Sequence, residues 1–92
     1  MKITNFGQAG TVESGDIRIQ IEANQGQGVV VELNGKSVVM KQFATQMKSV
    51  ILEKIKFFNL DDVTLKAQDN GALDYVIRAR VETAIKRAFE GG

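Results

Sequence analysis

Few side chains in this sequence can do chemistry, and the residue types that are missing restrict its function most. The chain has no His and no Cys, so neither a thiolate nucleophile nor a histidine-activated serine is possible. Zinc sites depend largely on the same two residue types. General acid–base catalysis would rest on carboxylates, lysines or Tyr75, the only tyrosine. A binding, carrier or structural protein is therefore expected rather than an independent enzyme.

The carboxylates do not form a recognisable metal or catalytic motif. Asp61, Asp62 and Asp69 lie beside the ends of predicted elements, where acidic residues commonly cap or form turns. The sequence has no calcium-binding loop motif and no glycine-rich nucleotide-binding motif. Capping is the favoured role of these three residues, and no metal site is predicted.

Ser14 has the setting of greatest interest. It precedes Gly15-Asp16, which is typical of a two-residue hairpin turn with glycine at positive φ. The predicted register pairs Ser14 with Ile17, Glu13 with Arg18 and Val12 with Ile19. A turn placed one residue earlier would oppose two acidic residues, Glu13 and Asp16, and is less favoured. From the residues alone, an ordinary turn role is favoured for Ser14. A functional role is the alternative, and for that role a hydroxyl at such a turn suits covalent attachment better than catalysis.

Two arginines near the C-terminus are the remaining candidates. Asp74, Arg78, Glu82 and Lys86 alternate in charge at i,i+4 spacing, which is typical of a solvated helix face. Arg80 lies at the margin of the apolar stripe, where it either covers the core or presents its guanidinium to an anion or partner. The structural role is favoured. Partner docking through Asp74, Arg78 and Arg80 is the alternative.

The composition is that of an ordinary globular protein. The chain has 92 residues, a net charge of +1, 43% hydrophobic residues and 25% charged residues. This length predicts a single domain spanning residues 1–92. Because basic and acidic residues are interspersed, nucleic acid is not an expected partner. No apolar run is long enough for a membrane span and the start lacks a signal-peptide pattern, so a cytoplasmic protein is expected.

Apolar periodicity predicts the elements that position these side chains. Residues 17–22, IRIQIE, alternate strictly, as in a half-buried strand that follows the strand before Ser14. Further strands are predicted at residues 29–33 and 62–69, and helices at about residues 38–58 and from Leu73 to Phe89, before a stop at Gly91. The order β-β-β-α-β-α gives an α+β fold, a two-layer domain with a small mixed sheet of about four strands covered on one face by two helices.

Residues 36–40 are ambiguous. Asn34-Gly35 is a strong hairpin signal, which would make this segment a further strand. The same residues could instead form the first turn of the following helix, with Ser37 as N-cap.

Three stretches in order resemble a known family: AGTVESGD (9–16), KQF (41–43) and DNGALDYVIRARVE (69–82). Together they resemble the citrate lyase acyl carrier proteins, the gamma subunits of bacterial citrate lyase, over essentially the whole chain. The resemblance implies that Ser14, in a turn with Glu13, Gly15 and Asp16, carries phosphoribosyl-dephospho-coenzyme A (phosphoribosyl-dephospho-CoA) through a phosphodiester. It also implies three partners: an alpha subunit that exchanges the acyl group, a beta subunit that cleaves citryl, and the enzyme that transfers the prosthetic group.

Two other readings remain open. The carrier subunit of malonate decarboxylase uses the same kind of prosthetic group. A small scaffold or regulatory module without an acyl group is an alternative from another class, in which Ser14 is only a turn residue. The carrier interpretation agrees with the composition, because thioester chemistry needs a sulfur that a chain without cysteine must obtain from a bound group.

Overall fold

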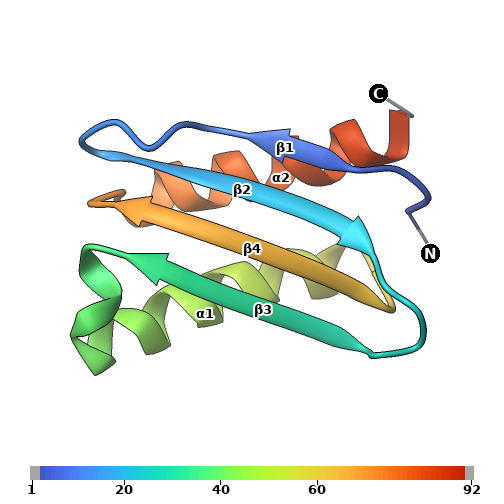
Figure 1. Cartoon of the computed structure of the whole chain (residues 1–92), viewed down its shortest axis with the longest axis horizontal. Coiled ribbons are helices and arrows are strands. Elements are labelled where there is room, and N and C mark those ends of the chain that lie inside the picture. The colour runs from blue at the N-terminus through green and yellow to red at the C-terminus, as the bar shows by residue number, and fades with distance from the viewer. Residues whose placement is uncertain (1–2, 91–92) are drawn as a thin grey trace.

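A four-stranded mixed sheet and two helices make up the fold (Figure 1). The computed structural model describes residues 3–90. Its elements are β1 (Gly7–Ala9), β2 (Asp16–Ala23), β3 (Val29–Gly35), a short 3-10 helix η1 (Ser37–Val39), α1 (Lys41–Phe57), β4 (Val63–Asn70) and α2 (Asp74–Glu90). The predicted α+β class and the order β-β-β-α-β-α are confirmed. The predicted stop at Gly91 lies outside the described residues.

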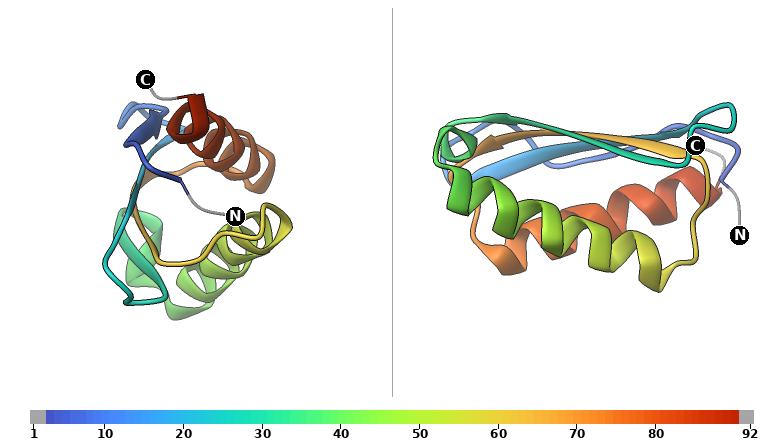
Figure 2. Two further views of the ribbon diagram at one scale, coloured as in Figure 1. Left: turned by 90° about the vertical axis from the view of Figure 1, so that its right-hand side faces the viewer. Right: turned by 90° about the horizontal axis from the view of Figure 1, so that it is seen from below.

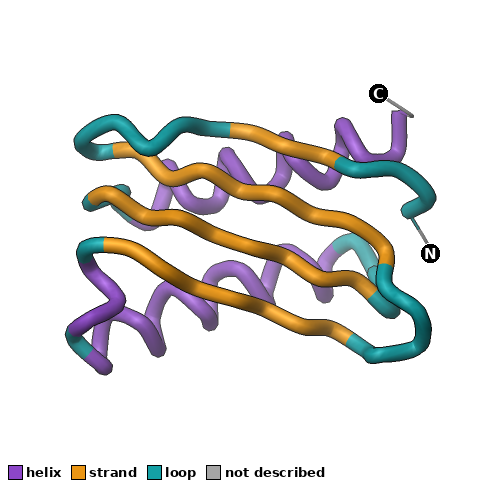
Figure 3. The backbone as a smooth tube through the Cα atoms, in the orientation of Figure 1, coloured by secondary structure: helices purple, strands orange, loops and turns teal. Residues whose placement is uncertain are grey.

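The strands lie in the order β1-β2-β4-β3 (Figure 3). β2 pairs antiparallel with β1 on one side and with β4 on the other. β3 pairs parallel with β4, and α1 makes the connection between these two strands. The C-terminal ends of β3 and β4 therefore lie at the same end of the sheet as the start of β2.

Both helices cover one face of the sheet, and the other face is open (Figure 2). Alternate residues of β2 and β4 point into the core, including Ile17, Ile19, Val63 and Leu65, each fully buried. The helices contribute buried residues such as Val50, Ile51, Ile77, Val81 and Ile85. The alternation predicted for residues 17–22 is thus confirmed, because the isoleucines face the helices and their polar neighbours face outward.

The segment before α1 differs from both alternatives for residues 36–40. It is not a strand: β3 ends at Gly35, η1 follows, and α1 begins only at Lys41. The N-cap residue is Met40, whose side chain makes no capping hydrogen bond. Gly35 does not form a hairpin turn. It allows the end of β3 to lie close to the backbone of β4, because a Cβ there would collide with the Asp69 carbonyl oxygen. The Lys36 amide donates to that oxygen at 3.1 Å, so parallel pairing with β4 replaces the predicted turn.

Candidate functional site

The loop before β2 contains Ser14, and its geometry corrects the predicted hairpin. β1 lies further from the turn than expected, so Ile19 pairs with Ala9 instead of Val12. The predicted two-residue turn at Gly15-Asp16 is wrong. The Asp16 amide donates to the Glu13 carbonyl oxygen at 3.0 Å, which places Ser14 and Gly15 at the centre of the turn. Gly15 has a φ of 83°, as the third residue of a type II turn requires.

The turn forms one residue earlier because Asp16 does not face Glu13. Its Oδ2 accepts hydrogen bonds from the Thr11 amide at 3.0 Å and from the Thr11 hydroxyl at 2.9 Å. Its Oδ1 accepts from the Ile17 amide at 2.7 Å. The repulsion expected between the two acidic residues is therefore avoided, since the Asp16 carboxylate turns back across the loop.

Arg80 of α2 binds the same carboxylate. Its Nε donates to Asp16 Oδ1 at 3.0 Å and its Nη2 donates to Oδ2 at 3.3 Å. This two-pronged geometry is favourable for an arginine–carboxylate pair. The side chain of Asp16 is only 15% exposed, whereas that of Arg80 is 43% exposed. Arg80 was expected either to cover the core or to present its guanidinium to an anion or partner, and its spacing did not identify the Asp16 carboxylate as that anion.

The environment of Asp16 keeps it ionised. Partial burial raises the pKa of this carboxyl, but hydrogen bonds from the Ile17 amide, Arg80 and Thr11 outweigh that effect and lower the pKa to about 2. The carboxylate is therefore charged at any physiological pH, and its pairing with Arg80 persists there.

Gly10 allows the loop to lie close to β2. Its φ is 85°, and a Cβ at this position would collide with the Ile17 carbonyl oxygen. The same Cβ would lie 3.1 Å from Cδ of Arg80. Only glycine fits a position that combines positive φ with backbone contact of this kind.

Asn70, at the end of β4, holds the loop from its other side. Its carbonyl oxygen accepts a hydrogen bond from the Gly15 amide at 2.7 Å, and its side-chain Nδ2 donates to the Val12 carbonyl oxygen at 2.9 Å. The residues on either side of Ser14 are thus anchored to two elements, β4 and α2, that are distant in sequence.

Ser14 itself is exposed at the tip of this anchored loop. No hydrogen bond joins its hydroxyl to any of residues 3–90. A Cβ on the neighbouring Gly15 would have no atom within 4 Å, so the space beside Ser14 is open. The chain has no histidine to activate the hydroxyl. The arrangement presents an accessible hydroxyl at a fixed place, which suits attachment of a group.

The other predicted docking residues lie on the helical side, and their pairing differs from the expected ladder. Asp74 Oδ2 accepts from Gln46 Nε2 at 3.0 Å, and Arg78 Nη1 lies 2.8 Å from Glu53 Oε2. Both residues therefore pair with α1 rather than with each other.

Among residues 3–90, one i,i+4 pair of the predicted ladder forms an ion pair, that of Glu82 with Lys86 at 3.7 Å. Glu82 also lies 3.2 Å from Lys54 of α1. Its pKa is lowered by the hydrogen bond and charge of Lys54, and to a lesser extent by Lys86. The charged face of α2 therefore links the two helices.

Of the three candidate carboxylates, Asp69 has the predicted turn role, whereas Asp62 joins two loops. Asp62 Oδ1 accepts from the Gly28 amide, 34 residues away in sequence, at 3.0 Å. Asp69 is 2% exposed and accepts from the amides of Gly71 and Ala72 at 3.0 and 2.9 Å. Within residues 3–90, no group of acidic residues is arranged to hold a metal ion. Over the same residues, neither α1 nor α2 has the length and hydropathy of a transmembrane segment.

Comparison with known proteins gives full-length relatives. The family model described as "ACP: Malonate decarboxylase delta subunit (MdcD)" matches residues 4–88. The citrate lyase acyl carrier protein of Halothermothrix orenii is 44% identical over 99% of this chain and 94% of its own length. Those of Lactiplantibacillus plantarum and Pectobacterium carotovorum are 44% and 43% identical, over 98% and 99% of this chain and 91% and 92% of their own lengths.

A solved structure shares the fold at much lower sequence identity. The crystal structure of a Thermus thermophilus protein aligns with a TM-score of 0.57 and 14% identity. The alignment covers 97% of this chain but only 16% of that protein. This similarity concerns the fold alone.

Proposed function

The chain belongs to the family of citrate lyase acyl carrier proteins, and from this premise we propose that Ser14 is the attachment point of its prosthetic group. In this family the protein is the gamma subunit, a carrier that leaves catalysis to other subunits. The observation that carries the proposal is the exposed Ser14 hydroxyl in a loop that is anchored on both sides. Glu13, Gly15 and Asp16 complete the attachment turn.

The group we propose is phosphoribosyl-dephospho-coenzyme A, linked to Ser14 Oγ through a phosphodiester. When bound, it supplies the thiol for thioester chemistry, which the chain lacks. The residues of the loop fit such a group. The space beside Gly15 is open, and one of the two carboxylates of the turn, that of Asp16, is paired with Arg80. A phosphodiester at Ser14 therefore faces less repulsion than the acidic sequence of the turn suggests.

The loop's own residues would position and present the group. Thr11, Asp16 and Arg80 fix the start of β2, while Asn70 fixes the turn, so the backbone that carries Ser14 is held in place. A fixed attachment point on a long flexible group raises the local concentration of the acyl end at partner sites without new protein contacts. Holding the base of the group is thus the contribution of this chain.

The proposed partners are the alpha subunit, which exchanges acyl groups, the beta subunit, which cleaves citryl and would hold any Mg²⁺, and the enzyme that transfers the prosthetic group. We propose that they act in the cytoplasm and reach the carrier from the end that presents Ser14. Asp74 and Arg78 remain proposed docking residues, since Asp74 is exposed and the Arg78 side chain is 40% exposed. Arg80 is proposed to affect docking indirectly, because its ion pair with Asp16 orients the loop that contains Ser14.

The carrier subunit of malonate decarboxylase is the second candidate, because the matching family model bears that description. The curated relatives favour citrate lyase. Purification of the chain from its host together with its bound subunits distinguishes the two candidate functions. The purified complex would cleave citrate in the first case and decarboxylate malonate in the second.

Intact mass of the protein from citrate-fermenting host cells tests the attachment. We expect a covalent adduct with the mass of the prosthetic group in the wild type and in Ser49→Ala, a control serine exposed on α1. The adduct should be lost in Ser14→Ala, while circular dichroism stays unchanged. An unmodified wild type from such cells would contradict the proposal.

A further inference from the structure

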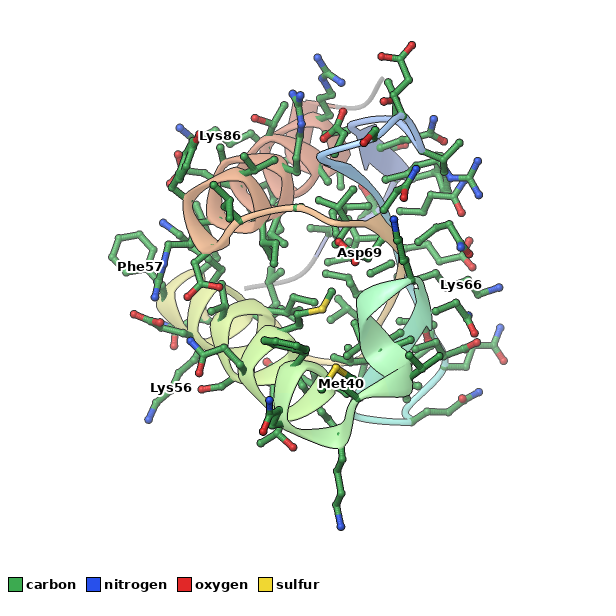
Figure 4. All side chains as sticks on the ribbon, turned by 90° about the vertical axis from the view of Figure 1, so that its left-hand side faces the viewer. Met40, Lys56, Phe57, Lys66, Asp69 and Lys86 are labelled. Carbon is green, nitrogen blue, oxygen red and sulfur yellow. The ribbon has the colours of Figure 1, made fainter. Side chains whose placement is uncertain are left out.

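A groove lies at the same end of the molecule as Ser14, between the N-terminal ends of α1 and α2. Its volume is about 350 Å³, and its walls are formed by Phe43, Gln46 and Met47 of α1 and by Gly71, Ala72, Leu73 and Asp74 at the start of α2. Figure 4 views this end of the molecule, with Met40 and Asp69 labelled. The volume lies at the lower end of the range of small-molecule sites, roughly 300–1,000 Å³.

The groove adjoins the attachment turn. Gly71, one of its wall residues, forms a backbone bridge with Asp16. A Cβ on Gly71 would lie 4.0 Å from the amide nitrogen of Gly15, the neighbour of Ser14. The groove therefore lies within reach of a long group attached to Ser14, and the distal end of such a group reaches it by folding back along the turn.

The groove walls are chemically suited to a neutral chain with both apolar and amide segments. Phe43, Met47, Ala72 and Leu73 provide apolar surface, and two of them are substantially open to solvent: Phe43 is 46% exposed and Leu73 is 62% exposed. Covering such surface is favourable by about 25 cal/mol per Å².

One polar pair lies among these apolar walls. Gln46 donates to Asp74 at 3.0 Å, which leaves its amide oxygen able to accept from an amide N–H of a ligand. The Asp74 carboxylate disfavours a phosphate at the same place. The chemistry thus selects the amide-containing, thiol-bearing end of the proposed group over its phosphate-bearing end.

We infer that this groove is the resting site of the distal, thiol-bearing part of the group attached to Ser14. The inference rests on the proposed function of Ser14. Between transfers, the arm lies against Phe43 and Leu73 and its acyl thioester is partly screened from water. Because Phe43 and Leu73 on the groove walls are exposed, the arm leaves the groove at little cost when a partner subunit binds.

The test uses the full-length carrier with its group attached, and measures alkylation of the thiol by iodoacetamide. An arm that rests in the groove about 70–90% of the time leaves the thiol free for the remainder, so we expect alkylation about three- to tenfold slower than that of free dephospho-coenzyme A. Phe43→Ala and Leu73→Ala each remove an exposed wall residue and should bring the rate back towards that of the free thiol. Phe57→Ala is the matched control, since Phe57 is 73% exposed on α1 and does not line the groove.

Backbone amide chemical shifts of the apo and loaded proteins give a second readout. We expect changes at residues 43–47 and 71–74 in addition to those at the attachment turn, and a loss of the groove changes in Phe43→Ala. A thiol as reactive as the free compound, with shift changes confined to residues 11–16, would overturn the resting site while leaving attachment at Ser14 intact. A protein whose mass carries no adduct on Ser14 would instead overturn the proposed function, and the groove inference with it.

Discussion

Two glycine-containing loops lie at opposite ends of the sheet, and they are held in similar ways with one difference (Figure 3). The loop after β2 is held by Asn24, which donates to Gly28, and by Asp62, which accepts from the Gly28 amide. The loop before β2 also uses one asparagine and one aspartate, Asn70 and Asp16.

The difference is a long-range ion pair. Asp16 pairs with Arg80, which is 64 residues away, whereas the Asp62 carboxylate accepts from the backbone of Gly28. The loop after β2 is held by hydrogen bonds from Asn24 and to Asp62. The loop that contains Ser14 is in addition fixed by an ion pair to α2, a helix of the core.

The largest difference in stability between the two loops is expected when a methyl group is added at a glycine of each loop. Gly10→Ala should destabilise the protein by about 3 kcal/mol or more, since the Cβ meets the Ile17 carbonyl oxygen and φ is positive. Gly26→Ala in the other loop should cost only about 1 kcal/mol, since φ is positive but the space is open. Urea denaturation measures both, and equal losses would contradict the close packing of the first loop.

Removal of the Asp16–Arg80 ion pair should cause the second-largest loss of unfolding free energy. Arg80→Met should cost about 2 kcal/mol, because it leaves a largely buried, ionised Asp16 without its cation. Asp16→Asn combined with Arg80→Met should recover part of this loss, which a double-mutant cycle by urea denaturation would measure. Asp62→Asn is the matched change in the other loop and should show no coupling to Arg80. Equal stability of Arg80→Met and the wild type, with weakened subunit assembly, would favour direct docking by Arg80.

Acid should remove the stabilising contribution of Asp16 in the loop before β2 over a defined pH range. The pKa of Asp16 is lowered to about 2, below the roughly 3.9 of an unfolded aspartate, so its ionised form stabilises the folded state. This contribution is fully present above about pH 4 and is lost as the pH falls towards 2. The difference in unfolding free energy between the wild type and Asp16→Asn should therefore shrink over that range and stay constant from about pH 5 to 8. A difference that changes near neutral pH would contradict the assigned environment.

The smallest effect on stability is expected at Arg78. Its ion pair with Glu53 is solvent-exposed, so Arg78→Ala should change the unfolding free energy by about 0.5 kcal/mol or less, and less still at high salt. Weaker binding to the alpha or beta subunit in the same variant, measured by calorimetry, would support the docking proposal. Unchanged binding would contradict it.

The sequence predicted the parts of the fold that depend on local periodicity. The alternation at residues 17–22 and the helical stripes of α1 and α2 arise from spacing within one element, and these elements formed as expected. β1 was misplaced because GQA, the segment that forms it, has no β-branched residue and is too short for its alternation to be recognised. Its position is set instead by pairing with β2.

At the candidate site, too, the features set by neighbouring residues were predictable from the sequence, and those set by distant residues were not. The turn around Ser14 was recognisable, but its register depended on where the Asp16 carboxylate points. That direction is set by Arg80 and Thr11, and no spacing rule joins residues 64 positions apart. The role proposed for Ser14 comes from resemblance to a family, because neither its spacing nor its exposure distinguishes its hydroxyl from that of another exposed turn serine.

Peptide mapping of the loaded protein locates the attached group on a single residue. Trypsin should release residues 3–18, which include Ser14 as the only serine beside two threonines, Thr4 and Thr11. We expect this peptide to carry the whole mass of the prosthetic group and fragment ions to place it on Ser14. An adduct on Thr11, or on any peptide other than this one, would contradict the proposed attachment at Ser14.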